Sequence, residues 1–227
     1  HALHRNVDIK MLLFNKRIYG LTKGQYSPTS ELGKVTKSTP LGSADRPLSP
    51  CSFALAVGAT LVARTVDRNI AHMEETLKRA AAHKGAAFVE ILQNCNVYND
   101  LAWNVLYDRE SKVRHELRLE HGKPLVFGPA DDGKGLVLEG VKPKVVSVKD
   151  VPESALWVHD ETDRGTGLIL AQLWAPDYPI PLGVMVNEVD APIYEDLVLK
   201  QEQKVIADRG PGDIAALLRS GETWTIK

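Results

Sequence analysis

The chain has 227 residues, of which 44% are hydrophobic and 25% are charged, so it is long and apolar enough to bury a full core. Its formal net charge of −1 argues against the basic field on which nucleic-acid and membrane-surface binding depend. Two cysteines are too few for a disulfide scaffold, and no apolar run reaches the roughly 18–20 residues that span a bilayer, so we expect a cytoplasmic protein.

The N-terminal residues predict the end of a helix followed by a strand. Residues 1–6 are typical of a last helical turn that ends at Asn6, because Asn often terminates a helix before a strand. We expect that the chain begins inside that helix. Residues 7–14 end in an unbroken apolar run, which predicts a strand covered on both faces of a parallel sheet.

Residues 15–50 predict a long loop. The segment is rich in Gly, Ser, Thr and Pro and shows little periodicity. At about 35 residues it far exceeds the usual limit of roughly a dozen, and loops of that length inside compact domains are usually functional.

The next segments alternate between helix and strand. The sequence predicts a short buried helix from position 52, a strand at 60–66, an amphipathic helix at 70–83 and a buried strand at 87–92. This order is typical of a parallel α/β sheet. Beyond residue 100 the chain predicts mixed short elements, including a strand at 180–186. We therefore expect an α/β part over 1–100 and an extension over 101–227 that packs on it or on a partner subunit.

The loop opens with the residues best suited to chemistry. Positions 15–25 combine a side-chain amide, two glycines, a hydroxyl and lysines, and they follow a strand whose carboxyl end is the usual ligand-binding edge of a parallel sheet. Such groups suit a diphosphate, a hard cation and an anionic substrate. The same composition also fits an ordinary polar turn.

A longer string distinguishes these alternatives. Residues 14–43, FNKRIYGLTKGQYSPTSELGKVTKSTPLGS, resemble the thiamine-diphosphate loop of the β subunits of 2-oxoacid:ferredoxin oxidoreductases. The resemblance continues through SFALAVGATLVAR and AAFVEILQNCNVYND, and more loosely through WVHDE and GVMVNEVDAPIYED, so it covers essentially the whole chain. It implies a parallel-sheet thiamine-diphosphate-binding fold, truncated at its N-terminus, because the family's Gly-Asp-Gly stretch and three cluster cysteines would precede residue 1.

The resemblance also implies roles for residues of the loop. Leu21, Lys23 and Gln25 would bind the substrate, with Lys23 reaching the distal carboxylate of 2-oxoglutarate. Asn15 and Ile18 would hold Mg²⁺. The cofactor-binding residues would be Asn15, Ile18, Tyr19, Gly20, Leu21 and Thr22.

One position departs from the family pattern. The family usually has paired asparagines where Asn15 and Lys16 stand, and it takes a side-chain oxygen for Mg²⁺ from the position of Lys16. A protonated ammonium has no lone pair for a cation. Either Asn15 takes over that task or metal binding is weakened.

Cys95 follows the predicted strand 87–92. A cysteine in such a place is most often an inert small hydrophobic residue. The resemblance instead implies that Cys95 is the fourth thiolate of a [4Fe-4S] cluster and that its sulfur faces the Leu21 turn. Cys51 matches no family ligand and is expected to be structural.

The function implied is that of a β subunit in an enzyme that oxidatively decarboxylates 2-oxoglutarate, or a related 2-oxo acid, with coenzyme A to an acyl-CoA and CO₂. Its cofactors would be thiamine diphosphate, Mg²⁺ and the [4Fe-4S] cluster, its partner an α subunit, and its electron acceptor ferredoxin. Two alternatives stay open. One is a pyruvate or branched-chain 2-oxoacid enzyme, and the other is a non-catalytic α/β interaction subunit.

Overall fold

The chain opens with a short helix and a strand, as predicted. The computed structural model describes residues 1–222, 224 and 226. Helix α1 (Ala2–Arg5) ends at Asn6, whose φ of 55° lies in the left-handed region, and β1 (Lys10–Asn15) follows. The strand begins at Lys10 rather than at position 7 because its pairing with a neighbouring strand starts there.

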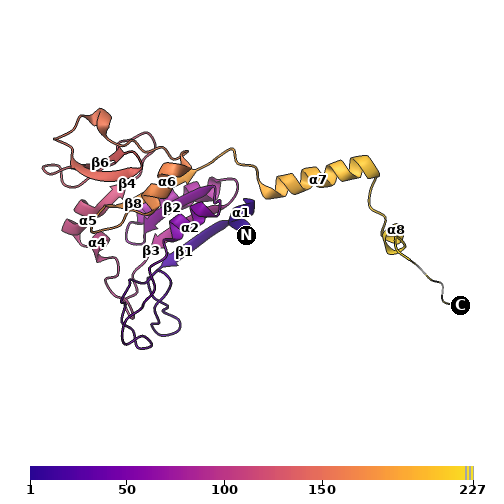
Figure 1. Cartoon of the computed structure of the whole chain (residues 1–227), viewed down its shortest axis with the longest axis horizontal. Helices are drawn as coiled ribbons and strands as arrows, with labels where there is room; N and C mark the ends of the chain where they lie inside the picture. Colours follow the sequence, from indigo (N-terminus) through magenta and orange to yellow (C-terminus); the bar gives the residue numbers. More distant parts are fainter. Residues whose placement is uncertain (223, 225, 227) are drawn as a thin grey trace.

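A five-stranded mixed sheet forms the body of the molecule (Figure 1). Its strand order is β1-β3-β2-β8-β4. The first three are mutually parallel, as predicted, whereas β8 is antiparallel to β2 and parallel to β4. The α/β class with a mostly parallel sheet is therefore confirmed. Besides β1, the strands of this sheet are β2 (Leu61–Val66), β3 (Ala87–Leu92), β4 (Glu116–Arg118) and β8 (Ile180–Asn187).

Helices cover both faces of this sheet. The amphipathic helix α3 (Ile70–Ala82) packs its apolar side against β2, β3 and β8. Helices α2 (Pro50–Ala56) and α6 (Arg164–Ala171) pack on the opposite face. Because successive strand residues point to opposite faces, Arg64 of β2 and Glu90 of β3 both lie on the side of α2 and α6.

The prediction that the first strand is covered on both faces is wrong. Strand β1 lies at the edge of the sheet, and Leu12 and Phe14 keep 45% and 53% of their surface exposed. The reason is positional, since α3 lies over the neighbouring strands β2 and β3 instead. An apolar run by itself does not distinguish an edge strand with an open face from a central one.

The long loop is confirmed. Residues 16–49 join β1 to α2 without forming a helix or a strand. They leave the carboxyl end of β1 and extend beyond that edge of the sheet (Figure 1). The loop therefore lies at the edge where parallel sheets commonly bind ligands.

The residues beyond 100 contribute to two sheets. Strands β4 and β8 complete the main sheet, and a separate antiparallel sheet has the order β5-β6-β7. The predicted strand at 180–186 is confirmed as β8, which lies inside the main sheet between β2 and β4. The remaining short elements are α4 (Asn104–Tyr107), α5 (Arg109–His115), β5 (Val126–Phe127), β6 (Lys134–Glu139), β7 (Lys142–Ser147) and the 3₁₀ turn η1 (Glu153–Ala155).

The last helices, α7 (Tyr194–Arg209) and α8 (Ile214–Leu218), extend away from the body (Figure 1). Every residue of α7 is at least partly exposed. Among the described residues, no helix is both long and apolar enough to cross a membrane. The expected division at residue 100 stays a prediction.

Candidate functional site

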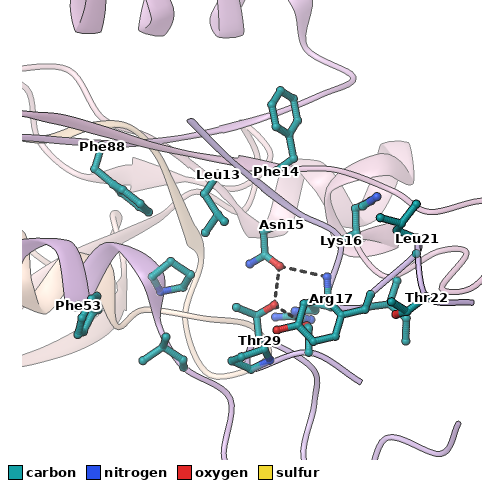
Figure 2. Close-up of a pocket in the computed structure, with 17 residues that line it drawn as sticks. Leu13, Phe14, Asn15, Lys16, Arg17, Leu21, Thr22, Thr29, Phe53 and Phe88 are labelled. Carbon is teal, nitrogen blue, oxygen red and sulfur yellow. Dashed lines mark hydrogen bonds between the residues drawn. The ribbon is translucent and has the colours of Figure 1, made fainter. Parts of the chain in front are cut away.

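A cavity of about 570 Å³ opens where β1 passes into the long loop. One side is apolar and includes Leu13, Phe53 and Phe88, which come from β1, α2 and β3. Figure 2 shows this apolar side and, facing it, a polar side that begins at Asn15 and continues into the loop. The cavity thus combines a water-excluding wall with a polar mouth, an arrangement typical of sites for small organic ligands.

Asn15 forms the base of the polar side and is held firmly. Only 5% of its surface is exposed. Its side-chain oxygen accepts hydrogen bonds from the Arg17 backbone N–H (3.1 Å) and the Thr29 hydroxyl (2.7 Å), as Figure 2 shows. Its side-chain nitrogen donates to the Glu90 carboxylate at 2.7 Å. Because a carbonyl oxygen has two lone pairs, the amide has no free acceptor.

Beneath Asn15 lies a fully buried ion pair. The Arg64 Nε atom donates to a Glu90 carboxylate oxygen at 2.7 Å, and neither side chain is exposed to solvent. Burial lowers the pKa of Arg64, but the adjacent Glu90 and Cys51 together outweigh burial, and the pKa is raised. Arg64 therefore stays charged, and Glu90 links it to the cavity through Asn15.

The buried thiol of Cys51 donates to the same Glu90 carboxylate at 3.3 Å. Burial raises the pKa of Cys51 well above its usual value, and Glu90 adds to the rise. The thiol is therefore protonated and inert at neutral pH, which agrees with the structural role expected for it.

Two cations line the cavity, and they differ in their surroundings. Arg17 forms an ion pair with Glu31 at 3.2 Å, and its guanidinium lies 3.8 Å from the centre of the Trp103 ring. Burial lowers the pKa of Arg17, partly offset by Glu31. Among the described residues, no side chain or carbonyl pairs with the Lys16 ammonium, and no carboxylate lines the cavity. The mouth is thus positively charged.

A tight turn at 19–25 forms the outer wall. The Tyr19 backbone N–H donates to the Gln25 carbonyl, and the Gly24 N–H donates to the Tyr19 carbonyl, both at 2.9 Å. Lys23 and Gly24 adopt φ values of 71° and 98°, which a glycine tolerates best. Leu21, at the tip of the turn, is 98% exposed.

The structure brings the six predicted cofactor residues together, because all of them line the cavity. Lys23 and Gln25, the two polar residues predicted to bind substrate, do not line the cavity. Lys23 is exposed. The Gln25 side-chain oxygen is buried and has no hydrogen-bond partner among the described residues.

Cys95 lies beside this turn. A Cβ atom placed on Gly20 would be 3.8 Å from the Cys95 sulfur and 3.4 Å from the Lys16 ammonium. Burial raises the pKa of the Cys95 thiol, but hydrogen bonds from the backbone N–H groups of residues 97–99, together with Lys16, lower it overall. This environment favours a thiolate, as at reactive or metal-binding cysteines. The described residues contain no group of three or more His, Cys, Asp or Glu side chains that could hold a metal ion.

Comparisons with known proteins agree with this geometry. The family model described as "Thiamine pyrophosphate enzyme, C-terminal TPP binding domain" matches residues 1–91, which include β1, β2 and all but the last residue of β3. The 2-oxoglutarate oxidoreductase subunit KorB of Mycobacterium tuberculosis is 40% identical over 230 aligned residues, which cover 100% of this chain and 61% of that protein. The chain is homologous to the β subunits of 2-oxoacid:ferredoxin oxidoreductases. The thiamine-diphosphate-binding fold is thereby confirmed.

Other β subunits of 2-oxoacid:ferredoxin oxidoreductases match shorter stretches of the chain. The 2-oxoacid:ferredoxin oxidoreductase β subunit of Saccharolobus solfataricus is 42% identical over 108 residues, covering 48% of this chain and 35% of that protein. A solved 2-oxoglutarate:ferredoxin oxidoreductase from Magnetococcus marinus, with 2-oxoglutarate, coenzyme A and succinyl-CoA bound, has the same fold. It superposes with a TM-score of 0.70 at 24% identity, covering 98% of this chain and 61% of that chain. The chain thus spans about three fifths of the length of the Mycobacterium tuberculosis and Magnetococcus marinus proteins.

Sequence analysis did not identify several residues of this site. Trp103 lies far along the chain, yet its ring N–H donates to the Asn15 carbonyl at 2.9 Å. Thr29 secures the Asn15 amide. The one signal for Arg64 and Glu90 is that each is a charged residue inside an otherwise apolar predicted strand, a placement that usually requires a partner.

Proposed function

We propose that this chain is part of the β subunit of a thiamine-diphosphate-dependent 2-oxoglutarate:ferredoxin oxidoreductase. The observation that carries the proposal is the position of the Cys95 sulfur next to the Gly20 turn, at the mouth of a positively charged cavity. That arrangement supports the proposal, because a cysteine whose thiol has a lowered pKa would lie beside the bound cofactor. The names and full-chain similarity of the relatives support the same assignment.

The cavity residues fit the cofactor. Lys16 and the polar groups of the turn offer charge and hydrogen bonds to a diphosphate, while Leu13, Phe53 and Phe88 would shield an organic ring from water. When bound, thiamine diphosphate supplies the carbanion chemistry of 2-oxoacid decarboxylation. The protein's own task is to hold the cofactor, exclude water and place the substrate next to the exposed Leu21.

Cys95 fits as one ligand of an iron–sulfur cluster. Backbone N–H groups surround its sulfur and favour the thiolate, which is the form that binds iron. A [4Fe-4S] cluster needs four such ligands, and the other three would come from outside the described residues. With the cluster at Cys95, electrons from decarboxylation would have a short path to ferredoxin.

Magnesium fits the described residues poorly. Among those residues, none donates a hydrogen bond to the Ile18 carbonyl, which stays available to a cation. Both lone pairs of the Asn15 side-chain oxygen are already used. The prediction that Asn15 and Ile18 hold Mg²⁺ stays untested, and no step of the proposed reaction depends on it here.

The proposed reaction consumes a 2-oxo acid and coenzyme A and gives an acyl-CoA, CO₂ and two electrons that leave singly to ferredoxin. The β-subunit names of the relatives support an α subunit as the partner that completes the enzyme. Steady-state reaction rates with 2-oxoglutarate, pyruvate and branched-chain 2-oxo acids would show which of these three substrates the enzyme prefers. An assembled complex without any of these activities would favour the interaction subunit, the alternative that Lys16 supports.

A substitution of Lys23 tests whether the enzyme prefers 2-oxoglutarate as its substrate. It is exposed on the turn beside Leu21, from which its long side chain can reach the second carboxylate of a dicarboxylic substrate. A charge-assisted hydrogen bond contributes about 1.5–3 kcal/mol. Lys23→Ala should therefore lower kcat/KM for 2-oxoglutarate by roughly ten- to a hundredfold, with little change for pyruvate.

Lys37→Ala is the matched control, because Lys37 is an exposed lysine of the same loop and does not line the cavity. It should leave both substrates unaffected. Equal losses on 2-oxoglutarate and pyruvate in the Lys23 variant, or no loss at all, would remove Lys23 from substrate selection.

A further inference from the structure

Lys16 is the unusual residue of the cavity. Its ammonium lies close to Gly20 and, among the described residues, takes part in no ion pair or side-chain hydrogen bond. The neighbouring cation Arg17 is neutralised by Glu31 and covered by Trp103. Lys16 therefore supplies the free positive charge of the mouth (Figure 2).

The described surroundings of Lys16 are unfavourable to a divalent cation. Mg²⁺ requires oxygen ligands, commonly carboxylates. The Asn15 side-chain oxygen already accepts two hydrogen bonds, so it has no lone pair left for a cation. A fixed ammonium in the same mouth adds electrostatic repulsion.

Cys95 does not account for the charge of Lys16 either. Both groups flank Gly20, but three backbone N–H groups contribute more than Lys16 to lowering the pKa of the Cys95 thiol. The thiolate is thus stabilised chiefly by the backbone. The Lys16 ammonium can therefore still donate hydrogen bonds to another anion, and the cavity that Lys16 lines can admit such an anion.

We propose that the Lys16 ammonium takes the place of a metal ion in neutralising the cofactor diphosphate, so that this protein binds thiamine diphosphate without Mg²⁺. The inference rests on the proposed function. An ammonium offers three N–H donors to phosphate oxygens, and such charge-assisted bonds are stronger in a partly desolvated cavity than in water.

Calorimetric titration of thiamine diphosphate into the full-length protein, assembled with its partner subunit, tests this. In excess EDTA, the wild-type affinity should stay within about threefold of its value in Mg²⁺. Lys16→Met should lower the affinity in EDTA by about ten- to a hundredfold, because it removes a charge-assisted contact. Lys16→Arg, which keeps the charge, should lose less.

Lys16→Asn completes the set, since it exchanges the charge for an amide oxygen that can coordinate a metal. Its binding should become dependent on Mg²⁺, and that recovery in Mg²⁺ also shows that the variant is folded. Lys37→Met, on the exposed part of the same loop, should bind as the wild type does with and without EDTA.

The outcomes separate the inference from the proposed function. Wild-type binding that EDTA abolishes, or Lys16→Met binding that is unchanged in EDTA, would overturn the role of Lys16 and leave the enzyme assignment standing. A wild-type protein that binds no thiamine diphosphate even in Mg²⁺ would overturn the proposed function itself.

Discussion

The floor and the rim of the cavity are built in opposite ways. The floor consists of Asn15, Arg64 and Glu90, which are buried and joined to one another by hydrogen bonds at 2.7 Å. The rim, residues 16–49, has no helix or strand and exposes Leu21 and Lys23 to solvent. The floor fixes one geometry because a broken bond there leaves a buried charge unpaired, whereas the rim keeps charged groups available for ligands.

The rim is nevertheless ordered by its own polar side chains. The Ser30 hydroxyl donates to the Arg17 carbonyl at 2.6 Å, and the Ser43 hydroxyl donates to the Glu31 carbonyl at 2.9 Å. Asn99 bridges to it from beyond β3 by donating to the Lys16 carbonyl at 3.0 Å. Such bonds stabilise less than a packed core, so we expect single changes in the rim to cost less than those in the floor.

The largest effect is expected from Glu90→Gln in the floor. The change leaves the Arg64 guanidinium buried without a counter-charge, which typically costs about 3–5 kcal/mol of stability. Urea unfolding of the purified variant would measure this. The matched control is Glu74→Gln, because Glu74 pairs with Lys78 at 2.6 Å on the exposed side of α3 and such pairs contribute about 0.3–0.5 kcal/mol. Similar losses of stability in both variants would show that the buried ion pair contributes no more than the exposed one.

The partly buried His72, on the other face of β2, extends the comparison. His72 of α3 hydrogen-bonds to the Thr65 hydroxyl at 2.8 Å, and burial lowers its pKa from 6.5 to about 4, with Arg118 adding to the shift. Between these pH values the unfolded chain binds a proton that the folded chain does not. Stability should therefore fall as the pH drops from about 6.5 to about 4, by about 1–3 kcal/mol given the partial exposure of His72.

Unfolding measured across that pH range in wild type and His72→Gln checks the assignment. The variant should show a flatter profile, because it has no imidazole to titrate. Buried His83 and His159 also have lowered pKa values and leave a residual slope. A profile unchanged in the variant would assign the acid sensitivity to those residues instead.

The smallest effect is expected at the junction of the two regions. Thr29 of the rim donates to the Asn15 oxygen of the floor at 2.7 Å, and Thr29→Val removes that bond with little change of shape. A loss of about 0.5–1.5 kcal/mol is expected from urea unfolding. The Ser38 hydroxyl lies in an exposed turn and, among the described residues, bonds only to Thr36, so Ser38→Ala should cost less. A Thr29 variant as stable as wild type would mean that rim and floor are independent.

The sequence by itself determined the local elements. The helix at 70–83 and the strands at 60–66 and 87–92 agree with α3, β2 and β3 to within a residue or two, because periodicity reports which side of an element is buried. The resemblance of residues 14–43 to a family also pointed to the cavity-lining turn, and the resemblance of residues 86–100 pointed to Cys95.

Only the tertiary structure decided which elements meet. Nothing in the apolar runs distinguishes β1 at the edge of the sheet from β8 between two other strands, and nothing local pairs Arg64 with Glu90 or brings Trp103 to Asn15. These contacts join residues far apart in the chain, and they form because buried charges and polar groups require partners that folding alone brings within reach. The accessibility of the Lys16 ammonium is likewise a property of the folded cavity.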